Sequence, residues 1–342
     1  MIDKTEQEIM AQWKGDISKP VVSICSITYN HEKFIEDALD SFLMQETDFP
    51  FEIVVDDDCS TDSTAEIIEK YIAKYPRIMN ANLREKNVGA MNNYLHNISR
   101  AKGTYIALCE GDDYWVDKLK IQEQRDTLEN YLECSFCGHD VNIVDADRNF
   151  MRKHSKGRIN EFWQRHIVDK RIALSAIWSI PHTSAMFFRK KYFNVTYFHI
   201  IDNTLGADYS LFVFLCTKGD LYYINKVMSS YRKHENSLSA SWQYGYNDEF
   251  MNETIRAHKN INKYFNYEFS KEINIHLNGA YMTKYEEQLK YSVRKTYIFK
   301  ALINLVQMIR HSENSQYTKR DILWIFRQEV IKKLKVCFNE NF

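Results

Sequence analysis

Short apolar runs alternate with helical patterns in the first part of the chain, and this alternation constrains its fold more than any other feature. The apolar runs are residues 21–27, 51–55 and 104–109. In the segments between these runs, apolar residues recur at three- and four-residue spacing. This spacing predicts helices over 34–43, 65–75 and 90–103. Ser63 and Glu66 have the spacing of a capping box at the second helix. We therefore expect an α/β fold, a mostly parallel sheet flanked by helices.

Each apolar run ends in polar side chains. The clusters are Thr28, Tyr29 and Asn30; Asp56, Asp57 and Asp58; and Glu110, Asp112 and Asp113 around Gly111. Ligands of parallel sheets bind beyond the carboxyl ends of the strands, so we expect the clusters to meet at one edge. Packed carboxylates repel one another unless they are protonated or neutralised. Mg²⁺ or Mn²⁺, bound together with a substrate diphosphate, would neutralise them, whereas one acidic turn alone would be a solvated loop.

Several classes of protein are disfavoured by the sequence. The chain has neither a GxxxxGK[ST] nor a GxGxxG motif, which argues against a P-loop or dinucleotide-binding fold. A formal net charge of −1 gives no general attraction for nucleic acid, so we expect no nucleic-acid partner. Seven cysteines, an odd number, suit a reducing compartment. Cys134 and Cys137 form a C-x-x-C beside His139, but no second pair follows at zinc spacing, so buried thiols are expected there.

Four motifs, in order, resemble the family 2 glycosyltransferases. They are VSICSITYNHEKFIEDALDS, EIVVDDDCSTDST, the NVG loop and YIALCEGDDYW, and the resemblance extends over about residues 20–235. The family implies the GT-A fold, a Rossmann-like sheet, and an inverting transfer of sugar from a nucleotide-sugar donor, most often a UDP-sugar. The implied cofactor is Mn²⁺ or Mg²⁺, and the implied acceptor is a hydroxyl of a glycan or lipid-linked glycan.

The resemblance implies roles for residues of the first half. Those that would bind the nucleotide are Thr28, Tyr29, Asn30, Asp57, Asp58, Asn87, Glu110 and Asp112. Those that would hold the metal are Asp112, Asp113 and His234. The chain departs from the family's Asp-x-Asp pattern at Glu110, whose longer carboxylate would reach ribose or a metal-bound water.

The second half would supply the rest of the site. By resemblance, the donor sugar and acceptor would contact His182, Thr183, Ser184 and Ala207, and the diphosphate would contact Arg232 or His234. Asp208 matches the family's catalytic base, although Ala207 replaces the acidic residue that often precedes it. Asp208 could instead serve only to stabilise a helix N-terminus, which favours carboxylates.

The composition changes near residue 240, so we expect a catalytic domain over 1–240 and a helical region over 241–342. From Lys290 to the end there are eleven Lys or Arg and four Asp or Glu, a net charge of +7. Basic amphipathic helices can lie on an anionic membrane, pack on the catalytic domain, or join two subunits in a homo-oligomer. With no apolar signal-peptide region and no long apolar run, we expect a cytoplasmic location, either free or at the inner face of the cell membrane.

Two other functions also fit part of the pattern. A sugar-1-phosphate nucleotidyltransferase combines a similar sheet with carboxylate-bound metal, but it would carry a Gly-rich loop near the first strand, and residues 21–32 have none. A non-catalytic module that binds nucleotide-sugar, or a scaffold for glycan assembly, is compatible with Ala207 in place of an acidic residue.

Overall fold

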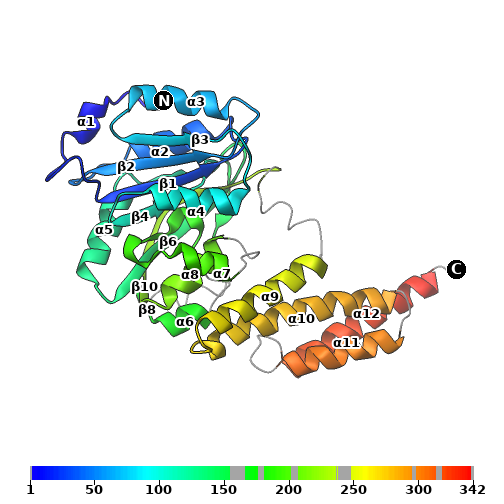
Figure 1. Cartoon of the computed structure of the whole chain (residues 1–342). Helices are drawn as coiled ribbons and strands as arrows, with labels where there is room; N and C mark the ends of the chain where they lie inside the picture. The colour runs from blue at the N-terminus through cyan, green and yellow to red at the C-terminus, as the bar shows by residue number, and fades with distance from the viewer. Residues whose placement is uncertain are drawn as a thin grey trace. The chain divides into compact units, whose positions relative to one another are not determined.

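The computed structural model describes residues 2–154, 166–175, 181–201, 207–235, 237, 248–294, 298–312 and 318–339. The chain divides into two compact units. Unit 1 comprises Met1–Val195 with Gly206–Ala240, and unit 2 comprises Thr196–Leu205 with Ser241–Phe342. Unit 1 is an α/β unit and unit 2 is helical, so the predicted fold class is confirmed (Figure 1).

Unit 1 is organised around one sheet whose principal strands follow the order β3-β2-β1-β4-β9-β6-β10-β5. The strands on this path are β1 (Val22–Thr28), β2 (Phe51–Asp57), β3 (Met79–Leu83), β4 (Tyr105–Leu108), β5 (Tyr114–Trp115), β6 (Cys134–Asp145), β9 (Phe187–Arg189) and β10 (Asp220–Lys233). Strand β7 (Phe150–Lys153) pairs with β6, and β8 (Ile167–Val168) pairs with β10. Strands β1 to β4 are parallel to their neighbours within that group, as are β6 and β10, whereas β9 runs antiparallel between β4 and β6.

Helices connect and flank the strands of unit 1. They are α1 (Glu6–Met10), α2 (Ile35–Leu43), α3 (Thr64–Lys74), α4 (Ala90–Arg100), α5 (Lys120–Asn130), α6 (Lys170–Ser175) and α8 (Ala207–Cys216). Helix α2 buries Ile35, Leu39 and Phe42 against the sheet because these residues share one face. Complete burial of each such side chain contributes about 1.5–3 kcal/mol. The apolar spacing in the sequence therefore corresponds to the core of the unit.

Two local predictions differ from the structure. Strand β3 was not among the three apolar runs that the sequence pattern indicated as strands. The expected capping box at α3 does not form, because the Ser63 side chain makes no cap hydrogen bond. Asp62 Oδ1 instead accepts the Thr64 N–H at 3.0 Å, and Glu32 accepts the Ser63 N–H at 3.1 Å. Glu32, which is distant in the sequence, thus accepts the Ser63 N–H that Glu66 of the capping box was expected to accept.

The C-x-x-C pair lies within strand β6, where both thiols are buried and neither forms a disulfide. Successive side chains of a strand point to opposite faces, so residues three positions apart cannot share a ligand on one face. This geometry agrees with the expectation of buried thiols.

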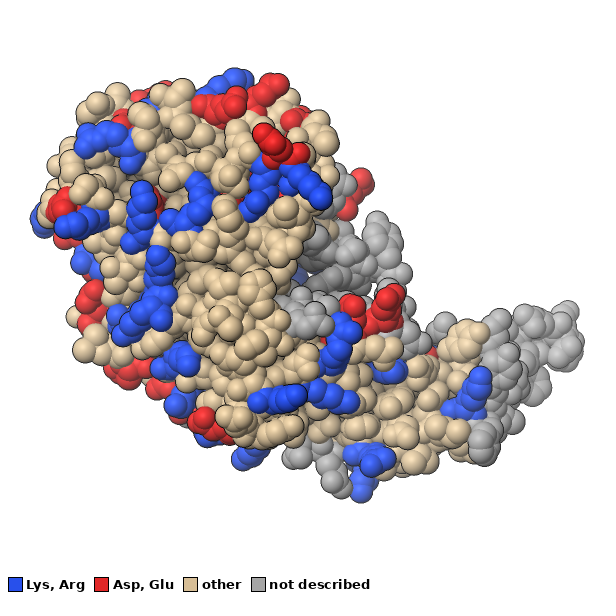
Figure 2. Space-filling view, viewed as in Figure 1, with Lys and Arg blue, Asp and Glu red and all other residues tan. Residues whose placement is uncertain are grey.

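The described residues of unit 2 form four long helices and part of a short one. They are α7 (Val195–Ile200, from Thr196 onward), α9 (Asp248–Tyr264), α10 (Ser270–Arg294), α11 (Ile298–His311) and α12 (Lys319–Asn339). Met282, Leu289, Met308 and Ile322 form a core between α10, α11 and α12. Figure 2 shows Lys and Arg side chains distributed along the visible face of this helical unit. Among the described residues, no helix combines the length and apolar character needed to cross a membrane.

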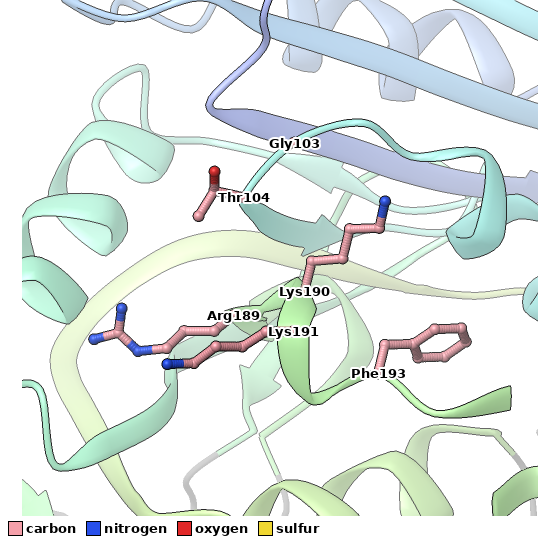
Figure 3. Close-up of a pocket in the computed structure, with 6 residues that line it drawn as sticks. All are labelled: Gly103, Thr104, Arg189, Lys190, Lys191 and Phe193. Atoms are coloured by element: carbon pink, nitrogen blue, oxygen red, sulfur yellow. The ribbon is translucent and has the colours of Figure 1, made fainter. Parts of the chain in front are cut away.

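A hollow of about 440 Å³ lies at the amino end of β4, the end opposite to the acidic turn (Figure 3). Its lining consists of Gly103, Thr104, Arg189, Lys190, Lys191 and Phe193. The guanidinium of Arg189 already donates to the Tyr105 hydroxyl at 3.0 Å, and the Lys190 ammonium donates to the Ala101 carbonyl. The hollow contains none of the residues predicted for the site.

Candidate active site

The acidic turn that follows β4 is fixed against the end of β1. The Gly111 N–H donates to the Ile27 carbonyl at 2.9 Å, and the Asp113 N–H donates to the Glu110 carbonyl at 3.1 Å. A Cβ on Gly111 would lie 2.8 Å from both Cβ and Oγ1 of Thr28, so only glycine fits this approach. The turn therefore places its carboxylates at the carboxyl edge of the parallel strands, as predicted.

Strand pairing brings the end of β10 to the same turn. Strand β5 runs antiparallel to β10, with Ser230 opposite Tyr114. The Arg232 N–H donates to Asp113 Oδ1 at 2.8 Å, and His234 Nε2 lies 3.0 Å from Asp112 Oδ2. Two segments about 120 residues apart in the sequence thus form one cluster.

Ligand atoms of Glu110, Asp112 and Asp113 all lie within 4.8 Å of one another. Burial, followed by the charges of Asp112 and Asp208, raises the pKa of Glu110 to about 8. Burial, followed by the charges of Asp112 and Glu110, raises the pKa of Asp113 well above its usual value. Burial also opposes ionisation of Asp112, but His31 and His234 outweigh it and lower the pKa of Asp112. The protein by itself leaves part of this negative charge uncompensated.

One carboxylate oxygen in the cluster, Asp113 Oδ2, is left without a hydrogen bond among the described residues, although it is buried. The nitrogen recorded near it is His182 Nδ1, at 3.6 Å, which is too long for a hydrogen bond. Buried polar atoms are nearly always satisfied, so an unsatisfied carboxylate oxygen beside two further carboxylates fits a divalent cation. Of the predicted ligands, Asp112 lies beside Asp113 in the acidic turn and 3.0 Å from His234.

The residues predicted to bind nucleotide form a linked group on the β1 and β2 side. The Asp58 N–H donates to the Thr28 carbonyl at 3.0 Å, and the Asn30 N–H donates to Ser60 Oγ at 2.8 Å. Ser60 in turn donates from its N–H to Asp57 Oδ2 at 2.9 Å. Asn30 adopts a φ of 57°, in the left-handed region, where its Oδ1 accepts the Thr61 N–H at 2.8 Å.

Asp58 and Asn87 hold the loop that leads into α4. The two carboxylate oxygens of Asp58 accept the N–H groups of Val88 and Gly89 at 2.8 and 2.9 Å. The Asn87 amide donates to the Asp58 carbonyl at 3.0 Å. Burial raises the pKa of Asp57, whereas Tyr29 is 44% exposed. These predicted residues lie close together, and the exposed side chain of Tyr29 is accessible to a nucleobase.

The residues predicted to contact the donor sugar and acceptor lie near Asp113, with His182 Nδ1 at 3.6 Å from Asp113 Oδ2. His182 Nδ1 lies 2.9 Å from Ser184 Oγ, and Ser184 Oγ lies 3.0 Å from Ser229 Oγ. The Tyr231 ring packs on the His182 ring with a centroid distance of 4.2 Å. Burial, followed by the charge of His154, lowers the pKa of His182 to about 3, so this imidazole is neutral. Thr183 donates a hydrogen bond to Glu110.

Asp208 lies in the first turn of α8, with Ala207 preceding it. Its Oδ1 accepts the Tyr209 N–H at 2.7 Å, and burial raises its pKa. The charge of Asp208 acts on Glu110, so the predicted base lies within electrostatic reach of the acidic turn. Its location is compatible with both interpretations considered from the sequence, a base and a helix-terminal carboxylate.

Arg232 occupies a different position from the one its predicted role suggests. Its guanidinium is buried, lies 4.6 Å from the centroid of the Phe34 ring, and donates to Asp37 at 2.7 Å. His234, rather than the Arg232 side chain, contacts the acidic turn. Neither Asp37 nor His31 was among the predicted site residues, although His31 directly follows the polar cluster at the end of β1.

Known proteins are similar to this chain in sequence and in fold. The chain matches the family model described as Glycosyl transferase family 2 over residues 23–196. The chain belongs to glycosyl transferase family 2. The protein Rv1520 of Mycobacterium tuberculosis is 34% identical over 69% of this chain and 65% of its own length. A relative from Bacillus subtilis, TuaG, named as a glycosyltransferase of teichuronic acid biosynthesis, is 34% identical over 40% of this chain and 52% of its own.

Two solved structures share a similar fold over most of the chain. S. aureus TarS in complex with UDP aligns with a TM-score of 0.60 and 18% identity, over 91% of this chain and 88% of its own. The mannosyltransferase PcManGT of Pyrobaculum calidifontis, in complex with GDP-Man and Mn²⁺, aligns with a TM-score of 0.54 and 13% identity, over 92% and 87%. The predicted family and its fold are confirmed, which removes the nucleotidyltransferase alternative.

Proposed function

We propose that the protein is an inverting glycosyltransferase that moves a sugar from a nucleotide-sugar, foremost a UDP-sugar, to a hydroxyl of a glycan or lipid-linked glycan. The observation that carries the proposal is the convergence of Glu110, Asp112 and Asp113 at the carboxyl edge of the sheet, with one buried oxygen unsatisfied. The ligands named for similar structures, UDP, UDP-GlcNAc and GDP-Man, support a nucleotide-sugar donor.

Asp112, Asp113 and His234 would hold Mn²⁺ or Mg²⁺ at this edge. The bound ion would supply Lewis-acid stabilisation of the negative charge that develops on the departing nucleoside diphosphate. The chain contributes the positions of the ligands: the Arg232 N–H orients Asp113, and Gly111 keeps the turn against β1. His234 would act on the diphosphate through the ion that it helps to hold, since the Arg232 guanidinium is paired with Asp37.

Asp208 would take the proton from the attacking hydroxyl. Inversion is a direct displacement, in which the acceptor oxygen forms its bond to the anomeric carbon as the bond to the diphosphate breaks. A positioned carboxylate contributes about 10²–10⁴-fold to such a proton transfer. The burial that raises the pKa of Asp208 makes it a better proton acceptor than an exposed aspartate.

The remaining residues would bind and orient the two substrates. The nucleoside would lie against Thr28, Tyr29, Asn30, Asp57, Asp58 and Asn87, and the sugar and acceptor would lie near Glu110, His182, Thr183, Ser184 and Ala207. The neutral imidazole of His182 can hydrogen-bond a sugar hydroxyl without adding charge. Holding both substrates in line converts an encounter in solution into a nearly unimolecular step.

Unit 2 offers a surface for a membrane that carries a lipid-linked acceptor. Exposed apolar side chains occur on both helices of its last pair, namely Leu302, Ile303 and Val306 on α11 and Leu323 and Trp324 on α12. Lys300, Lys319 and Arg320 are exposed on the same helices, and the segment from Lys290 onward has a net charge of +7. Apolar residues with a Trp and basic neighbours favour an anionic membrane interface, here the inner face of the cell membrane.

The decisive experiment measures UDP release and sugar transfer with a panel of UDP-sugars, with Mn²⁺, Mg²⁺ or EDTA, and with and without acceptors. We expect metal-dependent transfer to an acceptor and none in EDTA. Asp113→Ala should weaken metal-dependent donor binding, measured as a thermal shift, because it removes one of the ligands of the ion. Donor binding without transfer to any acceptor would favour a binding module, and full activity in EDTA would contradict the metal site.

A further inference from the structure

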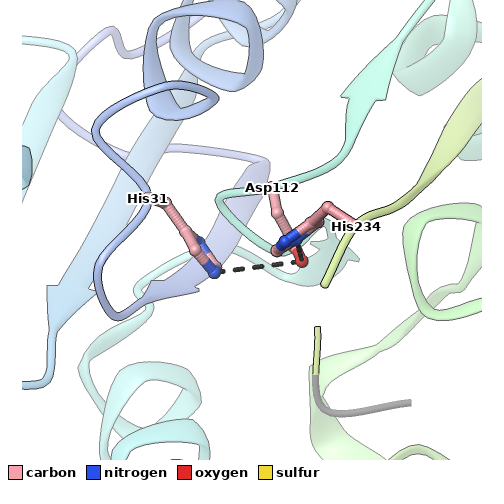
Figure 4. A group of neighbouring side chains, drawn as sticks. All are labelled: His31, Asp112 and His234. Atoms are coloured by element: carbon pink, nitrogen blue, oxygen red, sulfur yellow. Dashed lines mark hydrogen bonds and ion pairs between the residues drawn. The ribbon is translucent and has the colours of Figure 1, made fainter. Parts of the chain in front are cut away.

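Three side chains from three separate segments converge beside the acidic turn. They are His31, which follows β1; Asp112, in the turn after β4; and His234, which follows β10 (Figure 4). Asp112 Oδ2 lies 3.0 Å from His234 Nε2 and 3.9 Å from His31 Nε2. Two ligand atoms that share one ion at about 2.1 Å each lie roughly 3–4 Å apart, so these distances suit a common ion.

The imidazole of His31 lacks the hydrogen bonds that a buried ring requires. Its side chain is 14% exposed, its Nδ1 is buried without a partner among the described residues, and its Nε2 is too far from Asp112 for a hydrogen bond. An ion between Nε2 of His31 and Asp112 Oδ2 would give Nε2 the partner that the carboxylate, at 3.9 Å, does not provide. The ring proton would then lie on Nδ1, the nitrogen that points away from the ion.

The two histidines are held in position by contacts that do not involve the ion. The backbone N–H of His31 donates to Thr64 Oγ1 at 2.8 Å, and the backbone carbonyl of His31 accepts the N–H groups of Phe34 and Ile35. The Phe34 ring packs on the His234 ring at 4.5 Å between centroids, and the two imidazoles lie edge to face at 6.1 Å. Ligands that are fixed in advance lose little freedom when an ion binds.

We infer that His31 is a further protein ligand of the metal, and that the site selects Mn²⁺ over Mg²⁺ through two imidazoles and a carboxylate. The inference rests on the proposed function. Imidazole nitrogen is a poor ligand for Mg²⁺, which prefers oxygen, but a good one for first-row transition metals. Asp113 and the donor diphosphate would supply oxygen ligands to either ion. The imidazoles of His31 and His234 would therefore account for the higher affinity for Mn²⁺ than for Mg²⁺.

The test counts the histidines on the ion directly. Mn²⁺ is added to the full chain without nucleotide, and pulsed electron paramagnetic resonance compares protein with ¹⁵N-histidine and unlabelled protein. We expect nitrogen couplings from two histidines in the native protein and from one in His31→Gln. Native protein with one coupled histidine would overturn the inference and leave the proposed function intact. Native protein that binds no Mn²⁺ with or without UDP would overturn both.

Affinity provides the second readout. By titration, His31→Gln should weaken Mn²⁺ binding by about 10- to 100-fold and leave Mg²⁺ binding nearly unchanged. The matched control is His166→Gln, because His166 is exposed and its ring stacks on Tyr222; it should bind both ions like the native protein. An equal loss of Mn²⁺ and Mg²⁺ affinity in His31→Gln would show that His31 only packs the site. Unchanged Mn²⁺ affinity would also contradict the inference.

Discussion

Asp37 on helix α2 pairs with Arg232 at the end of β10, with the guanidinium donating to the carboxylate at 2.7 Å. The Arg232 side chain is 1% exposed, while Asp37 is 21% exposed. The backbone N–H of the same arginine donates to Asp113 in the acidic turn. One residue thus links the first helix after β1 to the carboxylate cluster through two different groups.

Asp37→Ala is expected to destabilise the protein, because it leaves the buried guanidinium of Arg232 without its anion. Breaking a buried pair costs about 3–5 kcal/mol, and the partial exposure of Asp37 places our expectation at or below about 3 kcal/mol. Chemical denaturation measures this loss. The control is Asp16→Ala, which removes an exposed pair with Lys19 and should change the free energy of unfolding very little. Equal stability of the two variants would show that the buried pair is not important.

Asp208→Asn should keep donor binding and lower the transfer rate by about 10²–10⁴-fold, because the amide cannot accept the proton. Steady-state kinetics should place the loss in kcat, with the thermal shift by UDP unchanged. A variant with native kcat would show that Asp208 serves only the N-terminus of α8.

The pH dependence of transfer should report the same carboxylate. Since burial raises the pKa of Asp208 above 3.8, the active carboxylate form is lost as the pH falls through that raised value. The acidic limb of kcat/KM should therefore lie above pH 3.8. The unfolded chain ionises Asp208 at lower pH than the folded chain, so its ionisation reduces stability as the pH rises through this window. Asp208→Asn should for this reason unfold at a slightly higher temperature at pH 7.

Gly111→Ala should disturb the acidic turn. The added methyl would lie 2.8 Å from Thr28 and 3.0 Å from Ile35 Cδ1, so the turn must move away from β1. Overpacking of this kind costs about 1–3 kcal/mol, and we also expect weaker Mn²⁺ binding by titration. Gly279→Ala in α10 is the matched control, because its methyl would meet nothing within 4 Å. Its unfolding temperature should be unchanged or slightly raised. Native Mn²⁺ affinity in Gly111→Ala would contradict the role of this close approach.

Replacing Leu323 and Trp324 with Ser should weaken binding to anionic vesicles. Each of these exposed side chains would otherwise bury apolar surface worth about 1.5–3 kcal/mol, so the loss should exceed tenfold in sedimentation. Leu132→Ser, at a residue 72% exposed in unit 1, is the control and should bind like the native protein. If the double variant keeps its vesicle binding but loses self-association in sedimentation velocity, the surface joins subunits instead.

The sequence by itself determined the α/β class and the position of the carboxylate cluster. Both depend on local patterns: apolar runs that end in polar residues place those residues at the carboxyl edge of a parallel sheet. The order of four motifs was sufficient to identify the family. The roles of individual residues at that edge remain predictions, since they depend on a bound substrate.

Only the tertiary structure decided which side chains meet across long distances in the chain. His31 and His234 approach the same oxygen of Asp112 because β1, β4 and β10 belong to one sheet, and no local pattern encodes that approach. The pairing of Arg232 with Asp37, and the contact of the Ser63 N–H with Glu32 in place of Glu66, likewise depend on packing between distant segments. A sequence pattern specifies the environment that a residue requires, whereas its partner is specified by the whole fold.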